Sequence, residues 1–362
     1  NEIVFKATTS DGGGYYWQAA TYDDFDGQSW HQSDRVASRV DAGQGLLDQT
    51  PEAPTAVGRR DISAIVSAVA FGGDLVISPA APRSIDRPAE VWTNGAAGPF
   101  ALAEFAGGLN DGESYVVQAS VRAEKEADGG LTRALLASAG QDYPAWLARY
   151  VRIEPGSVGP LTESTAHTIY DGLPPDRRDD FHVADAIQRY LDSTGGFQYA
   201  IDVRGVCTGS QIVECFLTSK VGYCEYFATT MVMLLRELGI PSRMVMGYLP
   251  GQRQPDGSWL VSRGAAHAWV EVYFPTYGWV PFDPTPGNQA NGQRPSEFEA
   301  GAALPTSGAS PGASGPLTRR TFAPDASTGV TGTGVLPPTS GGSGPLLVAL
   351  LVILGMGALI IG

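Results

Sequence analysis

The spacing of apolar residues changes near residue 130, and this change restricts the possible folds more than any other feature of the sequence. Before it lie short β-branched and aromatic runs, bounded by Gly, Pro, Asn and Asp, at 15–22, 62–70, 74–78, 89–93 and 114–123. Short strands at such intervals are typical of an antiparallel sandwich or barrel. We therefore expect residues 1–128 to form an all-β domain.

The stretch DDFDG at 23–27 has the acidic character of a calcium-binding loop. It lacks the other ligand positions of an EF-hand and the distal glutamate that completes one. We expect a hairpin turn at this position instead.

After residue 130 the apolar residues recur at helical intervals, in the segments 131–140, 145–153, 162–173 and 179–196. In the third of these segments Thr162 is a candidate N-cap and Gly172 is a stop signal. A short strand is expected at 197–202, and a helix from Cys224 to Gly239. Further strands are expected at 243–249, 258–263, 267–274 and 278–283. Helices followed by an antiparallel sheet indicate an α+β domain, which we assign to residues 129–287.

The chain after residue 287 does not have the pattern of a folded domain. In 301–344, 35 of 44 positions are Gly, Pro, Ser, Thr or Ala, which leaves too little apolar surface to offset the entropy of ordering. We expect 288–344 to be a disordered linker. Residues 345–362 are continuously apolar and would reach roughly 27 Å as a helix, so we expect them to span a membrane. The start, NEIVFKATTS, has no signal-peptide pattern, so we expect an upstream segment to direct the chain to its compartment.

The chain is acidic overall. It has 24 Lys and Arg against 38 Asp and Glu, which gives a formal charge of −14. No segment has the basic surface that nucleic-acid binding requires. We therefore expect no nucleic-acid partner, and we attribute the acidic excess to solubility.

Cys224 lies in the first turn of the helix predicted from Cys224 to Gly239. On this helix apolar residues recur at intervals of three or four, at Phe227, Met231, Leu234 or Leu235, and Leu238, so one stripe faces a core. The unpaired N–H groups and the positive dipole end of a helix start favour a thiolate over a thiol. A thiolate is the nucleophile of cysteine catalysis, whereas a structural buried cysteine is the ordinary alternative.

Two strands joined by a turn at Pro275–Gly278 add a base and a carboxylate. One face of the first strand is expected to present His267, Trp269, Glu271 and Tyr273. Asp283 ends the second strand, which should return antiparallel past His267. A tight turn would leave a stagger of about three residues, roughly 10 Å, so we expect a looser loop or a bulge. Cys224, His267 and Asp283 are then the nucleophile, base and orienting group of acyl transfer.

The segments GYCEYFA, HAWVEV and GWVPFDPTPG, in this order, resemble the transglutaminase-like superfamily of papain-type cysteine enzymes. The resemblance is closest to bacterial membrane-anchored transglutaminase-like proteins, and it is specific over residues 197–287. It implies a papain-like core, with a catalytic helix packed on an antiparallel sheet, and a triad of Cys224, His267 and Asp283. It also implies upstream membrane helices, an extracytoplasmic catalytic domain and a downstream cytoplasmic part. The backbone N–H of Cys224 is the natural first oxyanion donor.

Cys207 and Cys215 lie in the loop predicted before the catalytic helix. No CxxC pair or histidine at ligand spacing accompanies them, so we expect no metal site, and the resemblance implies no cofactor. In an extracytoplasmic domain a disulfide between them is favoured over two free thiols. Glu225 and Glu271 are able to bind an amine, but exposed carboxylates at helix starts and on strands are common. We therefore expect both to be ordinary surface residues.

Together these features predict an extracytoplasmic, membrane-anchored cysteine acyltransferase that moves a glutamine-type acyl group to an amine through a thioester. The expected partners are proteins or peptides with glutamine-type amides, amine acceptors, and the membrane through the C-terminal helix. Hydrolysis needs only water in place of the amine. A cysteine peptidase or amidase acting on peptide or cell-wall amides is therefore the first alternative. A non-catalytic binding module on the same fold is the second, and the intact triad argues against it.

Overall fold

The computed structural model describes residues 2–48, 50–52, 57–71, 73–123, 130–207, 209 and 211–287. The predicted linker (288–344) and the predicted membrane helix (345–362) lie outside these residues. Among the helices that the structure describes, none has the length and apolar character needed to cross a bilayer.

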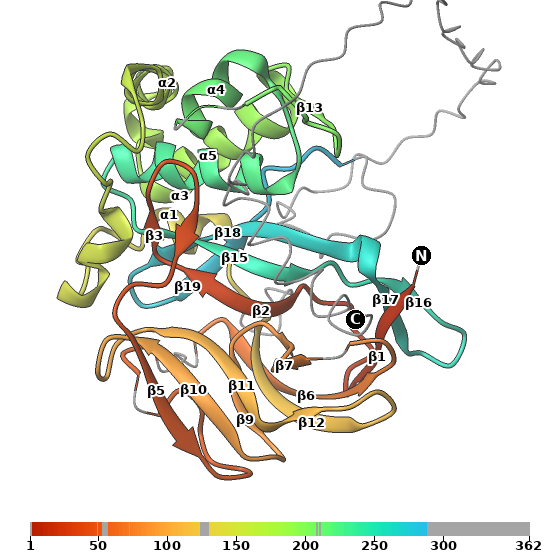
Figure 1. The fold of residues 1–362 in the computed structure, drawn as a ribbon. Helices are drawn as coiled ribbons and strands as arrows, with labels where there is room; N and C mark the ends of the chain where they lie inside the picture. Colours follow the sequence, from red (N-terminus) through yellow and green to blue (C-terminus); the bar gives the residue numbers. More distant parts are fainter. Residues whose placement is uncertain are drawn as a thin grey trace, which may run out of the picture.

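Two antiparallel sheets contain most of the strands (Figure 1). The smaller sheet has the spatial order β16 (Gln252–Arg253), β17 (Trp259–Ser262), β1 (Ile3–Thr9), β6 (Arg59–Ala68), β12 (Ser114–Arg122) and β9 (Pro82–Ile85). The larger has the order β19 (Gly278–Phe282), β18 (Ala266–Phe274), β15 (Ser242–Tyr248), β2 (Trp17–Tyr22), β11 (Phe100–Leu109), β10 (Ala89–Asn94) and β5 (Arg35–Val40). Two short strands extend the larger sheet: β7 (Gly73–Leu75) pairs with β11, and β8 (Ser78–Pro79) pairs with β2.

The helices gather on one face of the larger sheet (Figure 1). They are α1 (Arg133–Ala137), α2 (Pro160–Asp171), α3 (Asp180–Arg189), α4 (Ile212–Ser219) and α5 (Cys224–Glu237). Short 3₁₀ helices occur at Ala145–Val151, Pro175–Arg177 and Arg263–Ala265, and a short π-helix at Tyr190–Thr194. A helical layer on an antiparallel sheet is the α+β arrangement predicted from the pattern change near residue 130.

Strands from the two halves of the chain are hydrogen-bonded to each other in both sheets. β2 lies between β15 and β11, and β1 lies between β17 and β6. The predicted boundary at residue 128 divides strands from helices along the chain, while in space both sheets continue across it. A strand that loses such a neighbour exposes a row of unpaired backbone groups, so the two halves depend on each other for their pairing.

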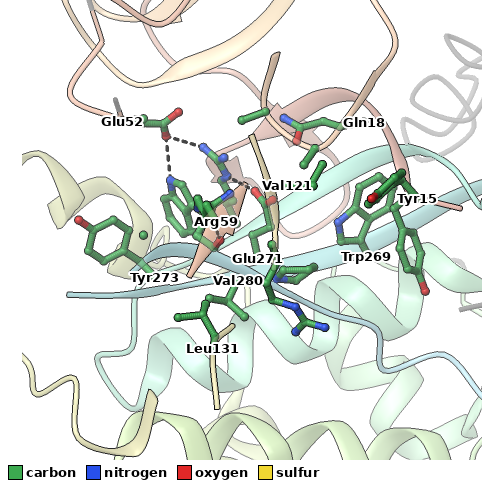
Figure 2. A pocket seen from close by; sticks show the side chains of 18 of the residues that line it. Tyr15, Gln18, Glu52, Arg59, Val121, Leu131, Trp269, Glu271, Tyr273 and Val280 are labelled. Carbon is green, nitrogen blue, oxygen red and sulfur yellow. Dashed lines mark hydrogen bonds and ion pairs between the residues drawn. The ribbon is translucent and has the colours of Figure 1, made fainter. Parts of the chain in front are cut away.

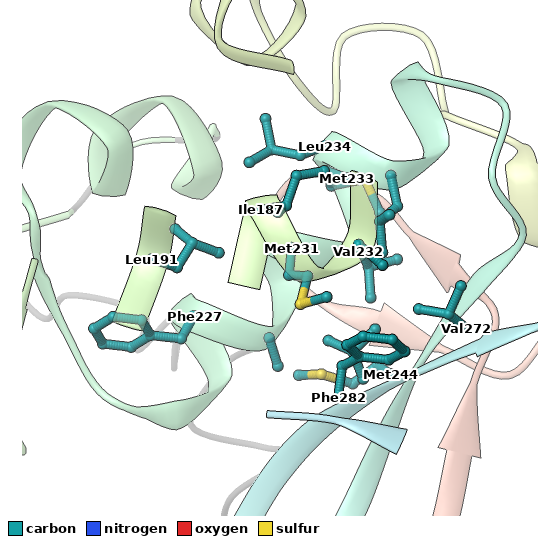
Figure 3. Packing of buried hydrophobic residues seen from close by; sticks show 14 of the residues in the cluster. Ile187, Leu191, Phe227, Met231, Val232, Met233, Leu234, Met244, Val272 and Phe282 are labelled. Atoms are coloured by element: carbon teal, nitrogen blue, oxygen red, sulfur yellow. The ribbon is translucent and has the colours of Figure 1, made fainter. Parts of the chain in front are cut away.

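Helix α5 is buried on all sides. Every residue from Cys224 to Arg236 is buried, because β15 and β18 pack on one side of the helix and α2, α3 and α4 pack on the others. The prediction of a single core-facing stripe is therefore too narrow. Figure 3 shows Met231 of α5 lying between Ile187 of α3 and the side chains of Met244 and Phe282 on the strands.

The start of α2 differs from the prediction. Its N-cap is Gly159, and Pro160 takes the first helical position, where the missing proline N–H leaves no bond unmade. Thr162 lies within the first turn, and its N–H and hydroxyl both donate to the carboxylate of Glu214. Gly172 is the C-cap, as predicted.

Three short segments agree with the prediction to different degrees. The DDFDG stretch forms the predicted hairpin, with β3 (Asp24–Phe25) paired to β4 (Trp30–His31). The strand predicted at 197–202 is only β13 (Gln198–Tyr199), which pairs in parallel with β14 (Val221–Gly222). Cys215 lies in α4 and not in a loop.

A buried ion-pair cluster lies between the two sheets (Figure 2). Arg243 of β15 is 1% exposed, and its guanidinium contacts Glu271 of β18 at 2.8 Å and Glu52 at 2.5 Å. Trp279 of β19 donates its indole N–H to Glu52 at 2.9 Å. Burial would lower the pKa of Arg243, but the two carboxylates outweigh it and raise that pKa. The cluster connects β15, β18 and β19 of the larger sheet to the segment that holds Glu52.

Because of this cluster, replacing Arg243 should lower the free energy of unfolding more than replacing Arg263 does. Arg243→Met leaves two carboxylates buried without their cation, so we expect the free energy of unfolding to fall by about 3–5 kcal/mol. Arg263→Met removes an exposed partner of Glu2 and should cost less than about 1 kcal/mol. Denaturant unfolding of both variants measures the difference. Similar small losses in both would show that the Arg243 cluster does not stabilise the fold.

Candidate active site

Cys224 is the first residue of α5 and is 2% exposed. Its N-cap, Tyr223, has extended backbone geometry and makes no side-chain cap. The thiol therefore sits at the positive end of a 14-residue helix dipole, where negative charge is favoured. Cys207 and Cys215 form a disulfide, as expected, which leaves Cys224 as the free thiol of the chain.

His267 on β18 contacts Asp283, the residue after β19. The two strands pair antiparallel, with Val270 opposite Phe282 and Phe274 opposite Gly278. The connection is thus a tight loop, with Thr276 at a φ of +74°, and the predicted looser loop or bulge is wrong. In this register the position opposite His267 lies two residues beyond Asp283 along the chain, instead of the predicted three. The two side chains bridge this distance, and His267 Nε2 lies 2.8 Å from Asp283 Oδ2.

The charge on His267 is favoured by both of its neighbours. Complete burial would lower its pKa, but the Asp283 carboxylate and the hydrogen bonds to Asp283 and to Cys224 raise it to about 10. Because Nε2 faces Asp283, Nδ1 is the ring nitrogen that remains for the thiol. A proton on the imidazole is therefore favoured near neutral pH.

Asp283 is held by groups from three separate parts of the chain. Its Oδ1 accepts the N–H of Thr285 at 3.0 Å, and its Oδ2 accepts the hydroxyl of Tyr16 at 2.7 Å as well as facing His267. Its own N–H donates to the side-chain oxygen of Gln188 on α3 at 3.1 Å. These contacts fix the carboxylate in one position and spread its charge over several donors.

Tyr16 and Gln188 are site residues that sequence reasoning missed. Tyr16 is separated from Asp283 by 267 positions and Gln188 by 95, and neither belongs to a motif. The signal for Tyr16 is the aromatic run before β2, but that run equally predicts an ordinary strand. The ring of Tyr16 lies 5.0 Å from that of Trp269 and 6.0 Å from that of His267, so this aromatic pair covers the imidazole.

Glu225 and Glu271 are not surface residues, and the expectation that they are exposed is wrong. Glu271 is 7% exposed and is paired with Arg243. Glu225, next to Cys224, is 0% exposed, and neither carboxyl oxygen has a hydrogen-bond partner among the described residues. Burial raises the pKa of Glu225 to about 8. Glu225 is buried because other elements cover every side of α5, so the first turn of this helix does not face solvent.

The comparisons with known proteins agree with this arrangement. Residues 169–284 match the transglutaminase-like superfamily, and residues 1–125 match the TgpA N-terminal domain. YebA of Bacillus subtilis is 40% identical over 113 residues, which are 30% of this chain and 15% of YebA. A protein-glutamine gamma-glutamyltransferase of Pseudomonas aeruginosa is 40% identical over 89 residues, 24% of this chain and 13% of that protein. The matches thus span only a small part of these relatives' length.

Among solved structures, the periplasmic domain of TgpA from Pseudomonas aeruginosa has a similar fold. It superposes with a TM-score of 0.56 at 21% identity, and the match covers 78% of this chain and 87% of that domain. At this identity the likeness concerns the fold, which includes the N-terminal strands as well as the helical core.

The unpartnered carboxyl of Glu225 predicts a pH-dependent stability. Because burial raises its pKa from 4.5 to about 8, the folded protein holds this proton more tightly than the unfolded chain does. Its contribution to the free energy of unfolding therefore falls as the pH rises through this interval, by at most about 1.4 kcal/mol per pH unit. Glu225→Gln cannot ionise, so we expect its Tm to exceed that of the wild type by a margin that widens from about pH 5 to pH 8.

The matched control is Glu163→Gln, an exposed glutamate in the first turn of α2. Its Tm should follow the wild-type pH dependence. A constant difference between Glu225→Gln and the wild type across this range would show that Glu225 is ionised in the folded protein.

Proposed function

We propose that this chain, a member of the transglutaminase-like superfamily, is a cysteine acyltransferase that acts on glutamine-type carboxamides. Cys224 is the nucleophile, His267 the acid and base, and Asp283 the group that orients the imidazole. The observation that supports this most is the buried hydrogen-bonded series from the thiol at a helix start through His267 to Asp283. This order of groups is the one that nucleophilic catalysis by a thiolate requires.

In the first half-reaction the Cys224 thiolate attacks the carbonyl carbon of the carboxamide. The tetrahedral intermediate places negative charge on the former carbonyl oxygen, and the backbone N–H of Cys224 at the start of α5 is a donor for it. The imidazolium of His267 gives its proton to the amide nitrogen, the C–N bond breaks, and ammonia leaves. A thioester of Cys224 remains, and His267 is neutral.

In the second half-reaction a primary amine attacks the thioester carbonyl. Neutral His267 takes a proton from the attacking nitrogen, the C–S bond breaks, and Cys224 leaves as the thiolate beside the imidazolium. The products are a secondary amide and the starting enzyme. Water in place of the amine gives a carboxylic acid by the same steps, so hydrolysis is the alternative outcome of the same site.

The N-terminal match and the shared fold with a periplasmic domain favour an extracytoplasmic location. The disulfide between Cys207 and Cys215 is compatible with this, because such bonds persist in oxidising compartments. Membrane anchoring through residues 345–362 is part of the proposal and rests on the sequence. Protein substrates are proposed from the name of the Pseudomonas relative, a protein-glutamine gamma-glutamyltransferase.

Mass spectrometry distinguishes the possible reactions. The protein is incubated with a glutamine-containing peptide and a primary amine. We expect a peptide that gains the amine and loses ammonia. Conversion of glutamine to glutamate alone would identify an amidase, and peptide fragments would identify a peptidase. No change of the peptide under any condition would favour a non-catalytic module.

Variants of the proposed triad should lose turnover without losing the fold. Cys224→Ala and His267→Ala should each remove at least about 10³-fold in rate, and the double variant should be little worse, because neither group works without the other. Asp283→Ala should retain measurable activity, because this residue orients the base and stabilises its charge. His182→Ala is the control: this histidine pairs with Asp179 on α3 and should keep full activity.

Each rate is measured beside a thermal melt of the same variant. Full activity in His267→Ala would remove this residue from the mechanism. A loss of activity that follows a loss of folding in the melts would show a structural role only.

Tyr16 is proposed as a positioning residue, because it acts through Asp283. Tyr16→Phe keeps the ring but removes the hydroxyl that donates to Oδ2. We expect kcat to fall about tenfold, the size expected for one hydrogen bond to a charged group, with KM unchanged. Tyr15→Phe is the matched control, since its hydroxyl donates to the surface residue Asp11. An unchanged kcat for Tyr16→Phe, or an equal fall for Tyr15→Phe, would contradict this role.

A further inference from the structure

A cavity of about 130 Å³ lies between the two sheets, on the face of the larger sheet opposite α5 (Figure 2). Its floor is formed by Trp269, Glu271 and Tyr273 of β18, which alternate with residues in the core beneath α5. Its other wall includes Arg59 and Val121 at the ends of β6 and β12. Since a water molecule occupies about 30 Å³ of the liquid, the space admits several waters or one small organic group.

The cavity contains a polar side chain without a partner. Gln18 of β2 is 2% exposed, and neither its amide nitrogen nor its amide oxygen has a hydrogen-bond partner among the described residues. In Figure 2 its amide points toward the other lining side chains. A buried amide that makes no hydrogen bond is costly, so the amide of Gln18 is expected to meet a partner that enters the cavity.

The charged residues of the cavity are already engaged. Arg243 is paired with both Glu52 and Glu271. Arg59 donates to the backbone carbonyls of Ser120 and Trp279. What the cavity leaves unused is a neutral donor and a neutral acceptor side by side, between aromatic walls. That combination complements another amide, whose C=O accepts from the Gln18 nitrogen while its N–H donates to the Gln18 oxygen.

The cavity adjoins the triad without including it. Tyr16 lines the cavity, and its hydroxyl donates to Asp283. Gln18 pairs with Gly247, which pairs with His267 on the next strand. A Cβ on Gly247 would come within 3.0 Å of the Trp269 ring, so this ring covers the glycine between Gln18 and His267. Tyr16 and Pro281 are partly exposed, which opens this end of the cavity to solvent beside Asp283.

We propose that this cavity binds a side-chain carboxamide of a polypeptide through paired hydrogen bonds to Gln18, which a trans backbone amide cannot form because its C=O and N–H point in opposite directions. Cys224 does not line the cavity, so the bound amide is not the one that reacts. The binding of an amide in the cavity does not depend on the proposed function. The interpretation of this amide as a second contact with the polypeptide substrate rests on it. A ligand here also packs against Tyr16 and so contacts the residue that holds Asp283.

Binding to the Cys224→Ala chain tests the proposal without any chemistry. The probes are N-acetylglutamine N-methylamide, the matching N-acetylglutamate N-methylamide and N-acetylmethionine N-methylamide, titrated by protein-observed NMR, so that a primary carboxamide is present in the glutamine probe alone. We expect the glutamine probe to bind more tightly than the other two. Gln18→Leu in the same background should weaken it at least tenfold, because one partner of both hydrogen bonds is lost. Gln118→Leu, which changes an exposed glutamine on β12, should leave it unchanged.

Three results would overturn the proposal. Binding of the glutamate probe as tight as that of the glutamine probe would identify an anion site. Equal binding to Gln18→Leu would place the ligand elsewhere, and absence of binding up to the solubility limit would mean that the cavity holds water only. Gln18→Met provides a second variant if Gln18→Leu does not fold. If the glutamine probe binds but the peptide shows no turnover in the mass-spectrometry assay, the proposed function is refuted and the proposed binding site in the cavity stands.

Discussion

The pairing of β2 with β15 is the interaction on which the rest of the structure depends. It places the first strand of the larger sheet beside the strands that present the candidate site, although more than 200 positions separate them in the chain. This one contact brings Tyr16 to Asp283 and Gln18 into the row that contains His267. The N-terminal strands therefore complete the site as well as support it. This explains why a fold match to a related periplasmic domain extends over both halves of the chain.

The buried polar groups of this protein are of two kinds, those with several hydrogen-bond or ion-pair partners and those without a partner among the described residues. In the Arg243 cluster and around Asp283, each charge is met by partners from several parts of the chain, so that the desolvation penalty is largely offset. Gln18 and Glu225 have no such partners among the described residues. Both lie close to the candidate triad, one behind its histidine and the other beside its cysteine. A buried polar group that makes no hydrogen bond requires an explanation, and for these two residues the neighbouring candidate triad offers one.

Local patterns predicted the parts of the site that are close in sequence. The helix that begins at Cys224 and the hairpin from His267 to Asp283 follow from apolar spacing and from the turn residues between the strands. The register was mispredicted, since a tight loop at Pro275–Gly278 fits the two strands without a bulge. Tyr16 and Gln188 could not be found, because only tertiary pairing brings them to Asp283. The exposure of Glu225 was misjudged for the same reason: it depends on helices α2 to α4, which no local pattern places around α5.

The charge of the proposed catalytic state offers a reason why neither carboxyl oxygen of Glu225 has a hydrogen-bond donor among the described residues. In that proposed state, a thiolate on Cys224, an imidazolium on His267 and a carboxylate on Asp283 sum to one negative charge, which Tyr16 and the N–H of Thr285 help to stabilise. An ionised Glu225 would add a second negative charge beside the thiolate and would raise the cost of forming it. Hydrogen-bond donors around Glu225 would favour that ionised form. Burial raises the pKa of Glu225 to about 8 and so favours its neutral form near neutral pH, which leaves the positive potential of the helix start to the sulfur of Cys224.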